Sequence, residues 1–455
     1  MRRINRRYFA ALFFCSLALV SCGEKRAAEK VPVEAAPAPA KPSLEEAVSP
    51  AERPVVPEAK PETLAVLGEE PLVRVLVIEA RSSIRVRIPA AFFIAEGAES
   101  EPLVRIERGG DFVVKTSAGE VVLAEGKRRI VSLDAIFLKA EEGNCLAVNG
   151  KPYRGGLLFE IVSGGVIAIN VLGLDDYIKG VLPSEIGHLK PEQFEAYRAQ
   201  AIVARAYALS KLKDRSGELY DLNATIMDQV YSGILGENEG ATKAVDETRG
   251  LVCTFLGVPL KAYYCSCCGG HTADIRLAWP WKTPYPYLYG VRDTVPEMPG
   301  VSLCRGSRHF RWRVHWSGST LSGIIKKTLP RELKVGRGSV GRLEDLRVLG
   351  TAFDGRAKAI GIATDRGDHE VQGDRIRWVL KPDPASNAIL KSTLFKIDVA
   401  LVGDRVASVD MLGGGNGHGV GMCQTGAIRL AELGYPGEGI IRHYYPGAKI
   451  SRLYK

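Results

Sequence analysis

The sequence predicts an α+β protein, in which a β-rich N-terminal part leads into a mixed body with several helices. Two observations support this fold class. Short runs of alternating apolar and polar residues, such as residues 84–88, are typical of half-buried strands and recur up to about residue 171. From Glu192 to Lys213, by contrast, apolar residues recur at three- and four-residue spacing, as on the buried face of a helix. Because the strands precede the helices instead of alternating with them, we do not expect a doubly wound parallel sheet.

The order of elements follows from local signals. Strands should begin near Leu72, and residues 157–162 and 166–171 flank a Ser-Gly-Gly turn that predicts a hairpin. Pro191 suits the first turn of the long helix, because the N–H that proline lacks would be unpaired there anyway. Far downstream, residues 406–412 resemble a strand, and residues 422–433 resemble a helix that Gly434 closes.

The first residues resemble a bacterial lipoprotein leader. Four arginines precede an apolar stretch, residues 8–20, which is too short to span a bilayer as a helix. Residues 19–22 (LVSC) then resemble a lipoprotein cleavage box, so Cys22 is the expected lipidation site. Gly23 after it favours the outer membrane over the inner, on the periplasmic side of the cell envelope. The alternative is an ordinary signal peptide that ends near a cysteine by chance.

These patterns divide the chain into four segments. Residues 1–21 are the expected lipoprotein signal peptide. Residues 22–70 are rich in Ala and Pro and predict a disordered tether, because such a composition cannot bury enough apolar surface to fold. Residues 71–160 form the β-rich N-terminal part, and residues 161–455 form the main domain, which carries the motifs described below. We expect the strands before residue 160 to form part of one side of a cleft.

The net charge of the chain is modestly positive. It is +9 overall, and removal of the four leader arginines leaves about +5. The excess is spread along the chain, and no basic cluster is interleaved with aromatic residues, so we do not expect binding to nucleic acid. A mild positive charge would suit an anionic cell-wall polymer, although it decides nothing by itself.

Glu185 is the first candidate for chemistry, because its neighbours are mostly apolar. A carboxyl group among apolar side chains has its charged form disfavoured, so its pKa rises and it can donate a proton near neutral pH. The alternative is an ordinary exposed glutamate at a helix end. Asp175 and Asp176 are the nearest candidates for a second carboxylate, unless their side chains cap the start of a helix over residues 175–181.

Six short motifs accompany this glutamate in a fixed order. Together they resemble the stage II sporulation protein D family of peptidoglycan lytic transglycosylases, over residues from about 153 to 450. The motifs are residues 177–185 (YIKGVLPSE), 200–207 (QAIVARAY), 228–233 (DQVYSG), 268–272 (CGGHT), 418–427 (HGVGMCQTGA) and 443–447 (HYYPG).

The resemblance implies that residues 161–455 are a catalytic domain with a glycan-binding cleft. Glu185 would first protonate the oxygen between N-acetylmuramic acid and N-acetylglucosamine, and would then take the proton of the muramic hydroxymethyl group as an anhydro ring closes. Preferred strands would be those stripped of peptide. Side chains expected to bind the sugar, or alternatively to pack in the core, are Tyr177, Arg205, Tyr207, Tyr231, His418 and Gln424.

The glycine-rich loop at residues 413–421 has two interpretations. It could place His418 and Gln424 beside the glycan, or its glycines could simply permit tight packing. A nucleotide site is excluded, because no Gly-Lys-Ser/Thr ending follows and no suitably placed acidic residue is present.

A cysteine cluster offers ligands for a metal. Cys265, Cys268 and His271 have spacing suited to zinc, and Cys304 is a candidate fourth ligand. The alternative in an oxidising envelope is a disulfide, such as one between Cys268 and Cys304. Three cysteines outside the cluster look like isolated buried thiols: Cys145, Cys253 and Cys423.

Three hypotheses for the function remain. The first is a membrane-anchored lytic transglycosylase that acts in cell-wall remodelling, division or a sporulation-like process. The second is a protein of the same fold that binds peptidoglycan and recruits or enhances a cell-wall amidase without cutting glycan, as relatives do. A purely structural envelope protein, the third, does not account for Glu185, the His-bearing glycine loop and the cysteine cluster together.

Overall fold

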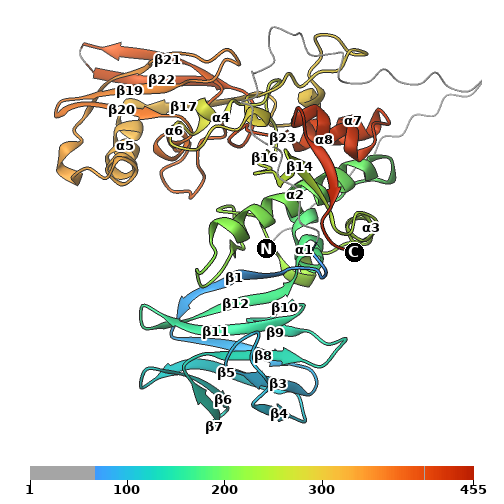
Figure 1. Cartoon of the computed structure of the whole chain (residues 1–455). Coiled ribbons are helices and arrows are strands. Elements are labelled where there is room, and N and C mark those ends of the chain that lie inside the picture. The colour runs from blue at the N-terminus through green and yellow to red at the C-terminus, as the bar shows by residue number, and fades with distance from the viewer. Residues whose placement is uncertain (1–66, 404) are drawn as a thin grey trace, which may run out of the picture. The chain divides into compact units, whose positions relative to one another are not determined.

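Two antiparallel-rich sheets dominate the first hundred residues of the computed structural model, which describes residues 67–403 and 405–455 (Figure 1). The expected leader, the lipidation site Cys22 and most of the expected tether lie outside the described residues. The first sheet consists, in order, of β13 (Leu222–Asn223), β1 (Leu72–Arg81), β12 (Gly165–Gly173), β11 (Gly156–Val162), β8 (Ile136–Ala140), β3 (Phe92–Ala95) and β4 (Val104–Ile106). The second consists of β10 (Lys151–Tyr153), β9 (Leu146–Val148), β2 (Ser83–Ile88), β5 (Gly110–Ser117), β6 (Glu120–Glu125) and β7 (Arg128–Leu133).

The predicted hairpin is confirmed as β11 and β12. The two strands pair in register from Gly156 with Val171 to Val162 with Gly165. Ser163 and Gly164 form the turn with φ angles of 51° and 79°, the combination that a tight two-residue hairpin requires. The alternating run at residues 84–88 is confirmed as β2, whose residues alternate between buried and exposed.

Helix α1 (Leu174–Ile186) follows β12 directly and carries Glu185 near its C-terminal end. The prediction that Asp175 and Asp176 cap this helix was wrong. The N-cap is Gly173, which makes no side-chain hydrogen bond. The Glu70 carboxylate instead accepts a hydrogen bond from the amide of Asp175 at 2.7 Å, and so satisfies a free donor of the first turn.

Helix α2 (Phe194–Asp214) lies at the centre of the body. It follows a 3-10 turn, η3 (Pro191–Gln193), so the prediction of a helix start at Pro191 is confirmed. Every residue from Ala196 to Ala208 except Arg198 is buried, which is more than the single buried face that the spacing predicted. The many alanines allow close approach on all sides, and α2 contacts α1, α3 (Glu239–Glu247), α7 (Gln424–Glu432), α8 (Gly437–Tyr444) and β14 (Leu251–Phe255).

Short elements complete the body. The strand β14 lies between β15 (Val258–Pro259) and β24 (Lys449–Arg452), and β16 (Tyr264–Cys265) pairs in parallel with β23 (Met422–Cys423). The predicted helix at residues 422–433 is therefore confirmed in α7, except that its first two residues form a strand. The remaining helical pieces are η4 (Gly233–Gly236), α4 (Ile275–Ala278), η5 (Pro286–Leu288) and η6 (Leu303–Gly306).

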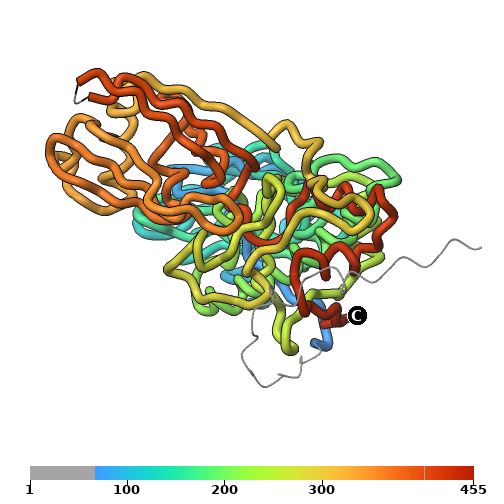
Figure 2. The backbone as a smooth tube through the Cα atoms, turned by 90° about the horizontal axis from the view of Figure 1, so that it is seen from above, coloured from blue at the N-terminus to red at the C-terminus, as the bar shows by residue number. Residues whose placement is uncertain are grey.

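Residues 312–413, which we call the inserted unit, have a core of their own around Trp316, Ile325 and Val409. The main core, by contrast, joins the N-terminal sheets to α1 and α2. Figure 2 traces the inserted unit in orange to orange-red. Its sheets are β17 (Trp312–Ser317), β22 (Arg405–Gly413) and β21 (Phe395–Val402), and β18 (Leu343–Val348), β19 (Ala359–Thr364) and β20 (Gly367–Gln372). Its helices are α5 (Gly318–Leu333), η7 (Arg337–Ser339) and α6 (Arg375–Val379).

The strand expected at residues 406–412 is confirmed as β22. Among the described residues, no helix combines the length and the apolar character needed to cross a membrane.

Candidate active site

Glu185 is a partly buried carboxyl group with one strong hydrogen-bond donor. The backbone amide of Val230 donates to its Oε1 atom at 2.6 Å. Burial raises the pKa of the Glu185 carboxyl to about 7, and the hydrogen bond from Val230 and a contact with the Gln424 side chain only partly oppose this rise. The group can therefore hold a proton at neutral pH and release it again, as a general acid and base must.

Asp228 fixes the loop that presents the Val230 amide. Its carboxylate accepts hydrogen bonds from the Tyr207 hydroxyl at 3.2 Å, from Arg215 at 2.8 Å and from the Asn223 amide at 2.9 Å. Its side chain is fully buried among these donors. Sequence reasoning gave this aspartate no role. Its position as the first residue of the third motif (DQVYSG) was the signal that could have identified it.

Gln424 brings the glycine-loop motif to the same place. It is the first residue of α7 and is almost fully buried. Its side chain contacts Glu185, and its Nε2 atom donates to Oε1 of Gln200 on α2 at 3.5 Å. Residues that are 239 positions apart therefore meet at one carboxyl group, because α1, α2 and α7 pack together.

His418 lies in an aromatic group that sequence reasoning did not identify. Its ring is 4.7 Å from that of Trp279 and 6.1 Å from that of Tyr263, centroid to centroid. Its Nδ1 atom accepts a hydrogen bond from the Val420 amide at 3.0 Å. Burial lowers the pKa of His418 to about 3, so the ring is neutral at pH 7 and carries its proton on Nε2.

Lys282 covers the same aromatic group. Its Nζ atom lies 3.8 Å from the centre of the Trp279 ring and donates to the Tyr263 hydroxyl at 3.2 Å. Burial lowers the pKa of Lys282 to about 8. Tyr263 also meets the ring of Tyr207 at 5.9 Å, and Tyr207 bonds to Asp228. The His418 group is thus connected through two tyrosines to the loop that holds Glu185.

Several side chains that were expected to bind sugar are buried in the core. Tyr177 is fully buried and donates to Gln229 at 3.2 Å, and Tyr231 donates to Asn170 at 2.8 Å. Arg205 is also fully buried. These three side chains are not placed to contact a sugar, and packing accounts for them. Tyr207 is 7% exposed, and its hydroxyl donates the hydrogen bond to Asp228 described above.

The two aspartates of α1 are held by other partners. Asp175 forms a buried ion pair with Arg205 at 2.5 Å and accepts from the Tyr454 hydroxyl at 2.9 Å. Asp176 pairs with Lys179 at 3.2 Å. Each carboxylate is thus engaged in an ion pair.

The glycine loop also shows why glycines are needed for packing. A Cβ atom on Gly415 would lie 2.7 Å from the backbone oxygen of Cys267, and one on Gly417 would lie 2.9 Å from Cβ of Cys265. Real Cβ atoms are not found so close to other atoms. Both interpretations of the loop are therefore compatible with the structure, because tight packing is what positions His418 and Gln424.

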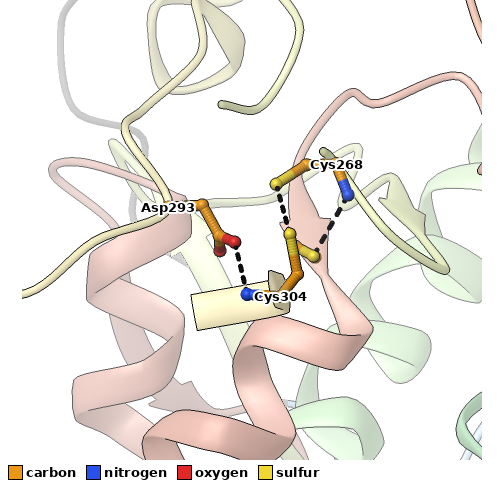
Figure 3. Close-up of side chains that lie close together, drawn as sticks. Cys268, Asp293 and Cys304 are labelled. Carbon is orange, nitrogen blue, oxygen red and sulfur yellow. Dashed lines mark hydrogen bonds between the residues drawn. The ribbon is translucent and has the colours of Figure 1, made fainter. Parts of the chain in front are cut away.

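The cysteine cluster differs from the predicted ligand set. Cys268, Cys304, Cys423 and Asp293 offer ligand atoms that all lie within 4.8 Å of one another. Figure 3 shows the sulfurs of Cys268 and Cys304 directed toward each other, 3.7 Å apart. That separation rules out a disulfide in this structure, in which both cysteines are free.

Two of the predicted ligands, Cys265 and His271, lie outside this group. Cys265 belongs to β16, which pairs with β23. The Nδ1 atom of His271 is 2.7 Å from the backbone oxygen of Thr272, and its ring packs against Phe353. The reason lies in the turn before His271, where Gly269 and Gly270 have φ angles of 81° and 120° and redirect the chain.

Two regions of the chain match models of protein families. Residues 162–255 match the family model described as Stage II sporulation protein, and residues 302–421 match a domain of unknown function that contains the inserted unit. Residues 162–255 therefore form a domain of the stage II sporulation protein type, and the chain as a whole is similar to stage II sporulation protein D.

Three bacterial proteins are similar to this chain over more than half of its length. An uncharacterized protein of Brachyspira hyodysenteriae is 28% identical over 354 residues, which cover 77% of this chain and 85% of that protein. The amidase enhancer of Bacillus subtilis is 27% identical over 366 residues, which cover 75% of this chain and 50% of that protein. The stage II sporulation protein D of Bacillus amyloliquefaciens is 26% identical over 308 residues, with 62% of this chain and 76% of that protein covered.

Proposed function

We propose that this protein is a peptidoglycan lytic transglycosylase that cleaves the bond between N-acetylmuramic acid and N-acetylglucosamine. The observation that carries the proposal is the state of Glu185. Its carboxyl group has its pKa raised to about 7 by burial, and its strongest hydrogen bond comes from an uncharged backbone amide. The match of residues 162–255 to the stage II sporulation protein model, and the similarity to stage II sporulation protein D, support the choice of substrate.

The mechanism requires one carboxyl group in two protonation states. Protonated Glu185 would give its proton to the glycosidic oxygen as the bond to the anomeric carbon breaks. The carboxylate would then accept the proton of the muramic C6 hydroxyl as that oxygen attacks the anomeric carbon, which closes the anhydro ring. The proton balance returns to its starting point, and no water is consumed.

The engagement of the two aspartates favours this route over hydrolysis. Hydrolytic glycosidases generally use two carboxyl groups, one as the acid and one as the nucleophile or base. Asp175 is held by Arg205 and Tyr454, and Asp176 by Lys179. Neither aspartate of α1 is therefore free to act as the second carboxyl group, which supports the intramolecular reaction.

Recruitment or enhancement of a cell-wall amidase is the second candidate function. The observation that favours it is the similarity to a Bacillus subtilis protein named amidase enhancer, over 75% of this chain. Such a role would need peptidoglycan binding but would not need the proton of Glu185.

Product analysis tests both candidates. The soluble form, starting at about Glu24, would be incubated with peptide-bearing and with amidase-stripped glycan and analysed by mass spectrometry. Wild type should release anhydromuramic ends, preferentially from stripped strands, and Glu185→Gln should lose activity by a factor of about 10² to 10⁴. Glu192→Gln is the matched control, because Glu192 is an exposed glutamate in η3.

The other outcomes are equally informative. Reducing ends in place of anhydro ends would mean hydrolysis and would contradict the mechanism. Binding of both glycans without any cleavage, together with stimulation of an added amidase by wild type and by Glu185→Gln alike, would overturn the enzyme in favour of the enhancer.

The location is part of the same proposal. A lipid anchor on Cys22 would hold the protein on the periplasmic side of the envelope, with the outer membrane favoured. The experiment is metabolic labelling with a fatty acid. Label should appear in wild type and not in Cys22→Ala, and equal labelling of the two would refute the anchor.

A further inference from the structure

We propose that Cys267, Cys268, Cys304 and Cys423 form a four-thiolate zinc site that fastens both ends of the inserted unit to the body. This ligand set shares only two residues with the set that local spacing predicted. It does not depend on whether the protein cuts glycan.

The sulfur positions suit a tetrahedral ion. Zinc binds thiolates at about 2.3 Å, so the sulfurs of a tetrahedral site lie about 3.8 Å from one another. The sulfurs of Cys268 and Cys304 are 3.7 Å apart. The Cys267 thiol contacts those of Cys304 and Cys423, and the thiols of Cys268 and Cys423 are also in contact. All four cysteines are buried, so the sulfurs lie away from water.

Backbone amides point at the sulfurs, as expected for thiolates. The amide of Cys268 donates to the Cys423 sulfur at 3.2 Å, and the amide of Gly426 donates to the same sulfur at 3.4 Å. The amide of Gly270 donates to the Cys268 sulfur at 3.4 Å. Cys423 is moreover the N-cap of α7, where the partial positive charge of the helix end favours an anion.

Asp293 acts on the site through Cys304. Each of its carboxylate oxygens accepts one hydrogen bond: Oδ2 from the amide of Cys304 at 2.9 Å, and Oδ1 from the Tyr444 hydroxyl at 2.7 Å. Figure 3 shows the first of these bonds. A carboxylate held in this way orients the ligand Cys304, and we assign the fourth position to Cys267 because its thiol meets those of Cys304 and Cys423.

The place of the site in the chain gives it a mechanical role. Cys304 lies eight residues before the start of the inserted unit and Cys423 ten residues after its end, whereas Cys267 and Cys268 belong to the body. One ion would therefore join the departing and returning chain at a single point. Since the inserted unit has a separate core, this junction limits how far it can move against the body.

Metal analysis of the soluble form, purified without chelator, tests the site. We expect about one equivalent of zinc per chain, and replacement by cobalt should give the thiolate-to-cobalt absorption bands of a sulfur-rich tetrahedral site. Cys267→Ser and Cys304→Ser should each lose the metal. Cys145→Ser is the matched control, because Cys145 is a partly buried thiol that lies outside the cluster, and it should retain it.

Two further measurements keep the proposal open to refutation if the cysteine variants fail to fold. Asp293→Asn should retain zinc, and loss of zinc from it together with retention in Cys267→Ser would overturn the ligand set. Removal of zinc from wild type by a chelator should speed proteolysis of residues 305–311 and 414–421. Less than about a tenth of an equivalent of zinc, or a disulfide between any two of the four cysteines in freshly isolated protein, would overturn the site.

Discussion

Helix α1 carries a buried or partly buried carboxyl group near each end, and the two have opposite surroundings. At the N-terminal end, Asp175 lies in the first turn, contacts two arginines, Arg205 at 2.5 Å and Arg249 at 3.5 Å, and accepts a hydrogen bond from Tyr454. At the C-terminal end, Glu185 is the penultimate residue, and the last turn contains no basic residue.

The helix itself sharpens this contrast. The N-terminal end of a helix carries a partial positive charge and the C-terminal end a partial negative one, so a carboxylate is favoured at Asp175 and disfavoured at Glu185. One end of α1 therefore contains a charge that stabilises the fold. The other end contains a group whose charged form the fold opposes, which is what acid catalysis at neutral pH requires.

The largest expected effect comes from removing the ion pair between Asp175 and Arg205 at the N-terminal end of α1. Arg205→Leu leaves the buried Asp175 carboxylate without its nearest cation, and we expect the free energy of unfolding to fall by about 3–5 kcal/mol. Urea unfolding followed by circular dichroism measures it. The double variant Arg205→Leu with Asp175→Asn should recover part of the loss. A loss below about 1 kcal/mol would mean that the pair contributes no more than a surface ion pair.

Replacement of Glu185, at the other end of α1, should raise the free energy of unfolding. Because the pKa of Glu185 is about 7 in the folded protein and about 4.5 when unfolded, folding loses stability as pH rises from 4.5 to 7. Glu185→Gln does not titrate, so relative to wild type it should gain about 1–3 kcal/mol across this window, after allowance for partial solvent screening. Thermal unfolding of both proteins at pH 4.5 and pH 8 measures the gain. An equal difference at the two pH values would contradict the raised pKa.

The smallest effect is expected at Asp176, next to Asp175. Its side chain is 40% exposed, and it shares Lys179 with Asp246. Asp176→Asn should therefore change the free energy of unfolding by less than about 1 kcal/mol, by the same urea assay. If Asp176→Asn lowered the free energy of unfolding as much as Arg205→Leu does, then burial would not explain why Asp175 and Asp176 contribute differently to stability.

The strands and the central helix could be predicted because their signals are local. The hairpin at residues 156–173 follows from two apolar runs and a turn, and the start of α2 follows from Pro191. Glu185 could be selected because apolar neighbours along the chain already suggest a protected carboxyl group. Arg205 could not be assigned its place, because its partner Asp175 is 30 residues away and no local pattern reports that contact.

The cysteine cluster shows the same limit more severely. Spacing along the chain selected Cys265 and His271, which are near Cys268 in sequence. The structure instead brings Cys423 to Cys268 across 155 residues, since the inserted unit lies between them and β16 pairs with β23. Ligand spacing therefore predicts a site only where the ligands share one stretch of chain.

The bond from Tyr454 to Asp175 has a consequence for biosynthesis. The two residues are 279 positions apart, and a ribosome that adds about 5–20 residues per second needs roughly 15–55 seconds to travel between them. After the first ten residues of that interval the nascent chain contains Glu185 but not Tyr454, the last partner of the helix that presents it. A chain that is released before Tyr454 is added contains Glu185 but lacks the hydrogen bond that Tyr454 donates to Asp175. The helix that carries the glutamate therefore obtains all of its contacts only when synthesis is almost finished.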